Sequence, residues 1–130
     1  MRLFLVRHAE AAPGEPDALR TLTAHGGEQA RELGRRFVRK GITPDAILSS
    51  PLLRARETAD GIAAAVGVAS EPDDRLAPGA TADNVRAAVA GRGEIVVVVG
   101  HQPDCAQIVA AIDGGPAPEF PAGGVRELEL

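Results

Sequence analysis

Apolar residues occur along this chain in short uninterrupted runs, separated by longer stretches with a helical spacing. The runs Leu3–Val6 and Ile95–Val99 are typical of strands buried on both faces of a sheet. Ala46–Ser49 indicates a further strand, and Val68–Glu71 indicates a short strand at an edge. Residues 125–130 alternate apolar and acidic side chains, which predicts a half-buried final strand.

Four helices are expected between these strands, over residues 23–40, 50–66, 81–90 and 103–112. Thr23 is an expected N-cap, because its side-chain oxygen can accept a hydrogen bond from the first turn of the helix. Ser50 and Pro51 predict the N-cap and the first helical position of the second helix. Pro and Gly residues within 11–20 and 114–124 predict loops.

The order of these elements predicts an α/β fold. Strands that alternate with helices form a mostly parallel central sheet with helices on both faces, here in a single three-layer domain. A chain of 130 residues has the length of about one domain, so we expect this domain to span residues 1–130. In sheets of this kind ligands bind beyond the carboxyl ends of the strands, and those ends are where chemistry is expected.

The composition excludes several classes of function. A net charge of −4 argues against general nucleic-acid binding, which needs clustered Lys and Arg, and the chain has no Trp or Tyr on which bases could stack. No apolar stretch approaches the roughly twenty residues of a membrane span, and the N-terminal apolar run is too short for a signal peptide. Cys105 is the only cysteine, so no intrachain disulfide can form. We therefore expect a cytoplasmic protein that binds neither nucleic acid nor membrane.

Three of the predicted strand ends carry residues suited to chemistry. Arg7 and His8 follow the first strand, Arg54 lies early in the helix after the second, and His101 follows the strand at 95–99. Each residue alone is more often an ordinary polar residue of a surface or loop. Because the carboxyl ends of parallel strands meet at one edge of a sheet, we expect two histidines and two arginines to meet there.

This set of residues suits a phosphoryl group. Guanidinium groups bind phosphate oxygens through paired hydrogen bonds, and helix N-termini add backbone N–H groups. A neutral imidazole is a competent nucleophile toward phosphorus, so His8 is the expected nucleophile, held in one tautomer by a group that the sequence does not identify. A protonated His101 is expected to stabilise charge on the transferred oxygens. His8, His101 and Glu10 offer an alternative metal site, but the arginines disfavour a divalent cation, so we expect no metal and no cofactor.

At these residues the chain resembles the histidine phosphatase superfamily, the family of phosphoglycerate mutases and acid phosphatases. The resemblance is carried by Arg7-His8, by Arg54 in Ser-Pro-Leu-Leu-Arg-Ala, by Gly100-His101 and by the segment Leu22-Thr23-Ala24-His25-Gly26. It runs through essentially the whole chain. It implies an α/β sheet sandwich, a nucleophile at His8, and a phosphate pocket made of Arg7, Arg54 and His101.

The short length and the stretch Asp17-Ala-Leu-Arg-Thr-Leu-Thr resemble the small SixA-type branch, the phosphohistidine phosphatases. Larger members carry an Asn soon after the Arg-His pair, whereas the only Asn here is Asn84. Larger members also carry a catalytic Glu two residues after a Leu, whereas Leu76 is followed by Ala77 and Pro78. The general acid of the family is therefore absent from its usual position, and nothing in the sequence assigns that role to the nearby carboxylates, Asp73, Asp74 and Asp83.

We accordingly expect a phosphatase that forms a covalent phosphohistidine on His8. Its expected substrate is phosphohistidine in a signalling protein, such as a histidine phosphotransfer domain. Two alternatives stay open from the sequence: a phosphomonoesterase acting on a small phosphorylated metabolite, and a non-catalytic module that binds phosphohistidine. The sequence identifies neither the physiological substrate nor the oligomeric state.

Overall fold

A computed structural model describes residues 1–130 and contains a single five-stranded sheet. Its strands are β1 (Arg2–Arg7), β2 (Ala46–Ser49), β3 (Ser70–Pro72), β4 (Ile95–Gly100) and β5 (Val125–Glu129). They lie in the order β3-β2-β4-β1-β5, and only β5 runs antiparallel to its neighbour. The sheet is therefore mostly parallel, as the alternation of strands and helices predicts.

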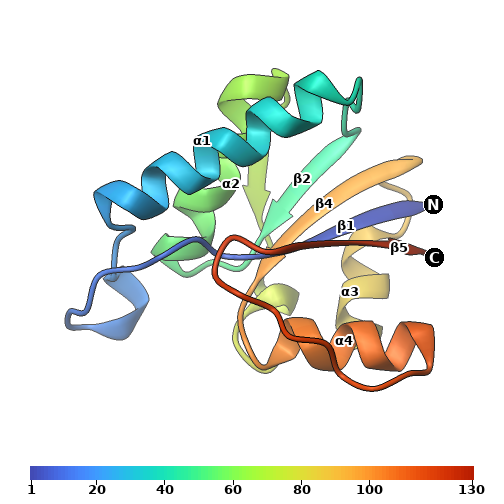
Figure 1. The fold of residues 1–130 in the computed structure, drawn as a ribbon. Coiled ribbons are helices and arrows are strands. Elements are labelled where there is room, and N and C mark those ends of the chain that lie inside the picture. The colour runs from blue at the N-terminus through green and yellow to red at the C-terminus, as the bar shows by residue number, and fades with distance from the viewer.

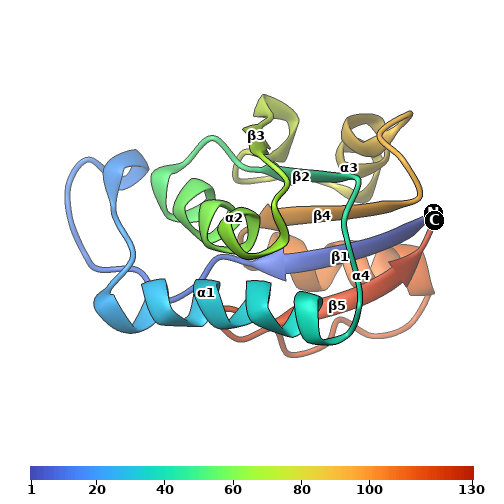
Figure 2. The same cartoon turned by 90° about the horizontal axis from the view of Figure 1, so that it is seen from above.

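Helices cover both faces of this sheet. Figures 1 and 2 show α1 (Ala24–Arg39) and α2 (Leu53–Val66) on one face, with α3 (Ala82–Val89) and α4 (Asp104–Asp113) on the other. Successive side chains of a strand point to opposite faces, so an uninterrupted apolar strand fills two cores. In β4 the side chains of Val97 and Val99 join the core under α1 and α2, whereas those of residues 96 and 98 join the core under α3 and α4. The α/β three-layer architecture is confirmed.

The register of the sheet aligns the strand ends that carry the predicted site. Arg7 pairs with Gly100 across β1 and β4, and Ser49 pairs with Val99 across β2 and β4. The residues that follow these strand ends therefore emerge side by side at one edge of the sheet. This edge is where an open parallel sheet binds its ligands.

Most predicted elements agree with the structure to within one or two residues. Thr23 caps α1 as expected, since its hydroxyl accepts a hydrogen bond from the N–H of Gly26 at 2.9 Å. Gly26 has a packing role, because a Cβ at this position would lie 2.0 Å from the carbonyl oxygen of Glu10. The first turn of α1 can therefore approach the segment that follows β1 closely.

Three details differ from the sequence predictions. The edge strand covers residues 70–72 rather than 68–71, and the predicted loop at 11–20 contains a short 3₁₀ helix, Asp17–Leu19. The prediction that Ser50 caps the second helix is wrong, because α2 begins at Leu53 and its N-cap residue, Leu52, makes no side-chain capping bond. The hydroxyl of Ser50 accepts from the N–H of Leu52 at 3.2 Å, one residue before the helix begins, and also contacts a histidine at the strand ends, which is described below.

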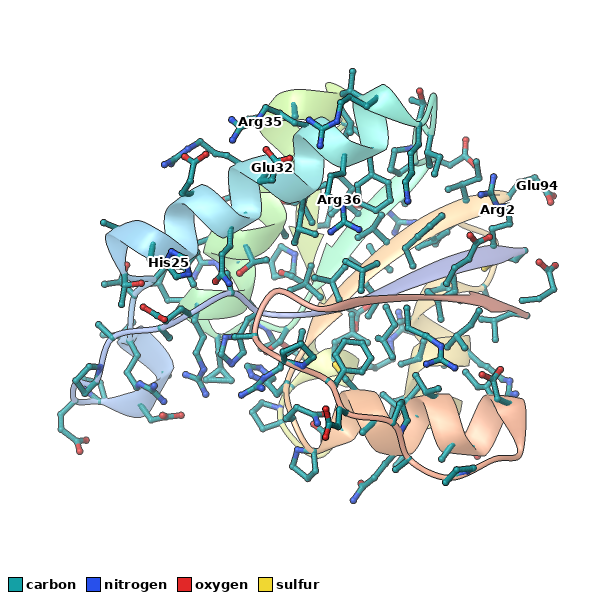
Figure 3. The ribbon with its side chains drawn as sticks, viewed as in Figure 1. Arg2, His25, Glu32, Arg35, Arg36 and Glu94 are labelled. Carbon is teal, nitrogen blue, oxygen red and sulfur yellow. The ribbon has the colours of Figure 1, made fainter.

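Charged residues line the outer face of α1. Figure 3 shows Glu32 and Arg35 together there, where Arg35 Nε lies 3.0 Å from a carboxylate oxygen of Glu32. His25, in the first turn of α1, is exposed. None of the helices is both long and apolar enough to cross a membrane.

Candidate active site

His8 lies directly beyond the end of β1. Its N–H donates to the carbonyl of Gly100 at 2.9 Å, and its carbonyl accepts from the N–H of Gly123 at 3.1 Å. The half-buried imidazole places Nδ1 at 2.7 Å from the carbonyl oxygen of Ala9. Because a carbonyl oxygen only accepts, Nδ1 carries the ring proton and Nε2 keeps a free lone pair. The group that fixes the tautomer of His8 is thus the carbonyl of the next residue.

The surroundings of His8 keep its imidazole neutral. Burial lowers the pKa of His8 below its usual 6.5, and the positive charges of Arg54, Arg7 and Arg20 lower it further, whereas the bond to the Ala9 carbonyl acts in the opposite direction. A lowered pKa means that the unprotonated imidazole predominates at pH 7. His8 therefore meets the requirement for a nucleophile in both charge and tautomer.

Three buried side-chain nitrogen atoms have no hydrogen-bond partner: Nε of Arg7, Nε of Arg54 and Nδ1 of His101. They are the only buried side-chain nitrogen or oxygen atoms of the structure in this condition. Leaving a buried polar group unpaired typically costs about 1–3 kcal/mol, so such groups call for an explanation. All three belong to the residues that the sequence assigns to a phosphate pocket, and a ligand rich in acceptor atoms would satisfy them.

His101 faces His8 across the strand ends. The two ring centroids lie 5.3 Å apart, and the planes are tilted by 59°. His101 is only 4% exposed, and its Nε2 lies 2.7 Å from the hydroxyl oxygen of Ser50. Burial, followed by the neighbouring His8 and Arg54, lowers the pKa of His101 to about 4. His101 is therefore neutral in the free protein at neutral pH, because a buried imidazolium beside an arginine is disfavoured, and its protonation toward a bound phosphoryl group stays a prediction.

The loop at residues 11–20 brings two further residues to the site. Asp17 accepts hydrogen bonds from Arg54 through its carbonyl, at 2.9 Å, and through its carboxylate, at 3.2 Å. Arg20 donates to the same carboxylate at 3.1 Å and to the carbonyl of Ala12 at 2.9 Å. Neither residue was assigned a role from the sequence, where the only signal was the resemblance of the Asp17–Thr23 stretch to SixA-type proteins. Arg20 is thus a third guanidinium whose charge acts on His8.

The other carboxylates named in the sequence analysis have different partners. Glu10 accepts from the hydroxyl of Thr23 at 2.9 Å, and Asp73 pairs with Arg75 at 2.7 Å. No group of three or more His, Cys, Asp or Glu side chains is arranged to hold a metal ion. Hydrogen bonds from Arg20 and Arg54 lower the pKa of Asp17, so its carboxylate is ionised at neutral pH and has no proton to give to a leaving group.

Comparison with known proteins identifies the family. Residues 3–78 match the family model of the histidine phosphatase superfamily (branch 1). This chain belongs to the histidine phosphatase superfamily. The matched range includes Arg7, His8 and Arg54, whereas His101 is brought to them by the register of β4.

An uncharacterised protein from Picosynechococcus is 36% identical to this chain over 123 residues, which cover 88% of this chain and 74% of that protein. A protein histidine phosphatase, SixA, solved in complex with tungstate, has a TM-score of 0.90 at 24% identity, with 100% of this chain and 88% of that chain covered. SixA from Agrobacterium tumefaciens has a TM-score of 0.84 at 29% identity, with 99% of this chain and 91% of that chain covered. The resemblance to the small SixA-type branch is confirmed.

Proposed function

We propose that this histidine phosphatase hydrolyses its substrate through a covalent phosphohistidine formed at Nε2 of His8. The observation that carries the proposal is the group of three unpartnered buried nitrogens on Arg7, Arg54 and His101, next to a neutral histidine in a fixed tautomer. Preorganised donors of this kind bind the oxygens of a transferring phosphoryl group. A SixA protein of this fold is complexed with tungstate, an oxyanion, which supports an anion site in such a protein.

The proposed reaction has two steps. Nε2 of His8 attacks phosphorus, a P–N bond forms, and the leaving group departs with the electrons of its bond to phosphorus. Water then attacks the phosphoenzyme, the P–N bond breaks with its electrons returning to Nε2, and inorganic phosphate is released. The proton that water gives up to solvent balances the one that the departed leaving group takes up. The proton stays on Nδ1 throughout, hydrogen-bonded to the Ala9 carbonyl, so the histidine returns in the same tautomer.

We further propose that the substrate is phosphohistidine in a cytoplasmic signalling protein, such as a histidine phosphotransfer domain. The leaving group of an alkyl phosphate is an alkoxide, which needs protonation by a general acid. Such protonation typically raises the rate roughly a hundred- to ten-thousandfold. Here Ala77 and Pro78 occupy the segment where larger relatives carry that acid, and Asp17 is ionised. The imidazole of a phosphohistidine departs as a neutral ring without such help once its other nitrogen carries a proton, because the conjugate acid of imidazole has an unperturbed pKa of only about 6.5.

A substrate panel tests this proposal. It compares a phosphohistidine protein, a phospholysine, an activated aryl phosphate and a sugar phosphate. We expect kcat/KM for phosphohistidine or the aryl phosphate to exceed that for the sugar phosphate by at least roughly two orders of magnitude. Equal rates on the sugar phosphate would instead identify a metabolite phosphomonoesterase, and binding of phosphohistidine without turnover would identify a non-catalytic module.

A further inference from the structure

Two side chains hold the peptide groups on either side of Ala9, whose carbonyl fixes His8. The Ala9 carbonyl belongs to the Ala9–Glu10 peptide, and the N–H of this same peptide donates to Oε1 of Gln29 at 2.9 Å. The N–H of Ala9 donates to Oγ1 of Thr58 at 3.0 Å. Gln29 lies in α1 and Thr58 lies in α2, so two helices on one face of the sheet determine the orientation of the Ala9 carbonyl.

Thr58 is completely buried, at 0% exposure. Its hydroxyl donates to the carbonyl of Arg54, one helical turn earlier, at 2.8 Å. This bond alone is common for a threonine in a helix. Because it uses the only hydroxyl hydrogen, the oxygen must accept the bond from Ala9. Thr58 therefore joins the segment that carries the nucleophile to the turn that carries Arg54.

Gln29 acts on the peptide that His8 contacts. Its bond to the N–H of Glu10 polarises the Ala9–Glu10 peptide, and hydrogen bonds in such chains strengthen one another. The Ala9 carbonyl is thereby a stronger acceptor for Nδ1–H of His8. The reach of Gln29 depends on the close approach of α1 to Glu10, which Gly26 allows.

We infer that Thr58 and Gln29 are positioning residues for the nucleophile. They hold the Ala9 carbonyl so that His8 keeps its proton on Nδ1 and its lone pair on Nε2. This role rests on the proposed function of His8 and requires no contact between either residue and the substrate.

Matched pairs of variants test the inference. Thr58→Val and Gln29→Leu remove the acceptor oxygen at nearly constant volume, whereas Thr58→Ser and Gln29→Glu keep an oxygen. With an aryl phosphate as substrate, we expect Thr58→Val and Gln29→Leu to lower kcat roughly ten- to a hundredfold and to leave KM unchanged. A small misplacement of a reacting group typically lowers the rate by about this factor. The second pair should stay within about threefold of wild type.

The tautomer of His8 provides a readout that a merely structural role would not change. In protein labelled with ¹⁵N-histidine, the wild type should show His8 protonated at Nδ1, and Thr58→Val and Gln29→Leu should show an increased Nε2–H form. The exposed His25 serves as an internal control. If Thr58→Val does not fold because it leaves the buried N–H of Ala9 unpaired, the half-buried Gln29 variant carries the test alone.

The outcomes separate this inference from the proposed function. An inactive wild type would contradict the proposed function, and the tautomer measurement would still decide the role of Thr58 and Gln29. An active wild type, with unchanged kcat and unchanged His8 tautomer in folded Gln29→Leu, would overturn the inference and leave the proposed function standing.

Discussion

The burial of His101 makes the stability of the protein depend on pH in mild acid. The pKa of His101 is about 4 in the folded protein, against a usual value of 6.5. Between these values the unfolded chain binds a proton that the folded protein does not, so the free energy of unfolding falls as the pH drops below 6.5. The loss is about 3 kcal/mol when complete, and about 2 kcal/mol between pH 7 and pH 4.5.

Urea unfolding of the wild type and of His101→Gln at pH 7 and pH 4.5 measures this loss. The wild type should lose about 2 kcal/mol more than the variant over this interval. Protonation of carboxylates with lowered pKa values, such as Asp73, also lowers the stability of the protein in acid, but this contribution is the same in both proteins. His25→Gln, at an exposed position, is the matched control and should follow the wild type. An equal loss in the wild type and His101→Gln would show that His101 accepts a proton easily in the folded protein, and would refute the reasoning about burial.

Three further predictions concern the reaction. His8→Ala should abolish turnover with the fold intact, and substantial activity in this variant would exclude the mechanism. Wild-type protein quenched during turnover should carry one phosphoryl group that is stable in base and labile in acid, as measured by intact-protein mass spectrometry. Arg54→Ala should lower kcat roughly a hundred- to a thousandfold. Arg54→Lys should restore only part of the lost kcat, because an ammonium group lacks the paired donors of the planar guanidinium. Wild-type kinetics in Arg54→Ala would place Arg54 outside the pocket. EDTA should not change the rate and orthovanadate should inhibit, because the proposed pocket consists of cationic and imidazole groups. A loss of activity in EDTA that a divalent ion reverses would contradict a metal-free mechanism.

The strand ends could be predicted from the sequence because strong local signals mark them. Five consecutive β-branched residues, Ile95–Val99, can be buried on both faces only at the centre of a sheet, and β4 does lie between β2 and β1. Once the strands are parallel, their carboxyl ends meet at one edge. The convergence of His8, Arg54 and His101 follows from this rule, without knowledge of any side-chain contact.

The parts of the site that were not predicted depend on tertiary contacts with no local signal. Asp17 and Arg20 lie in a loop with no periodicity, so nothing in the sequence shows that the loop folds back onto Arg54. Ser50 has the features of an N-cap, but its hydroxyl also lies against a histidine 51 residues away. The charge state of His101 is set by how deeply the ring is buried, which residue type alone does not determine.

The lowered pKa of His8 favours hydrolysis over retention of the phosphoryl group. A less basic imidazole is a poorer nucleophile but a better leaving group, so its phosphoryl form reacts more readily with water. Burial and the cations of Arg54 and Arg7 lower this pKa, so His8 is expected to be a better leaving group from phosphorus than an unperturbed imidazole. A mutase requires the opposite property, since its phosphoenzyme must persist until a second acceptor binds. The phosphoenzyme of this protein should therefore decay in water without an added acceptor, and a long-lived phosphoenzyme that transfers to a sugar hydroxyl would contradict the proposed hydrolysis.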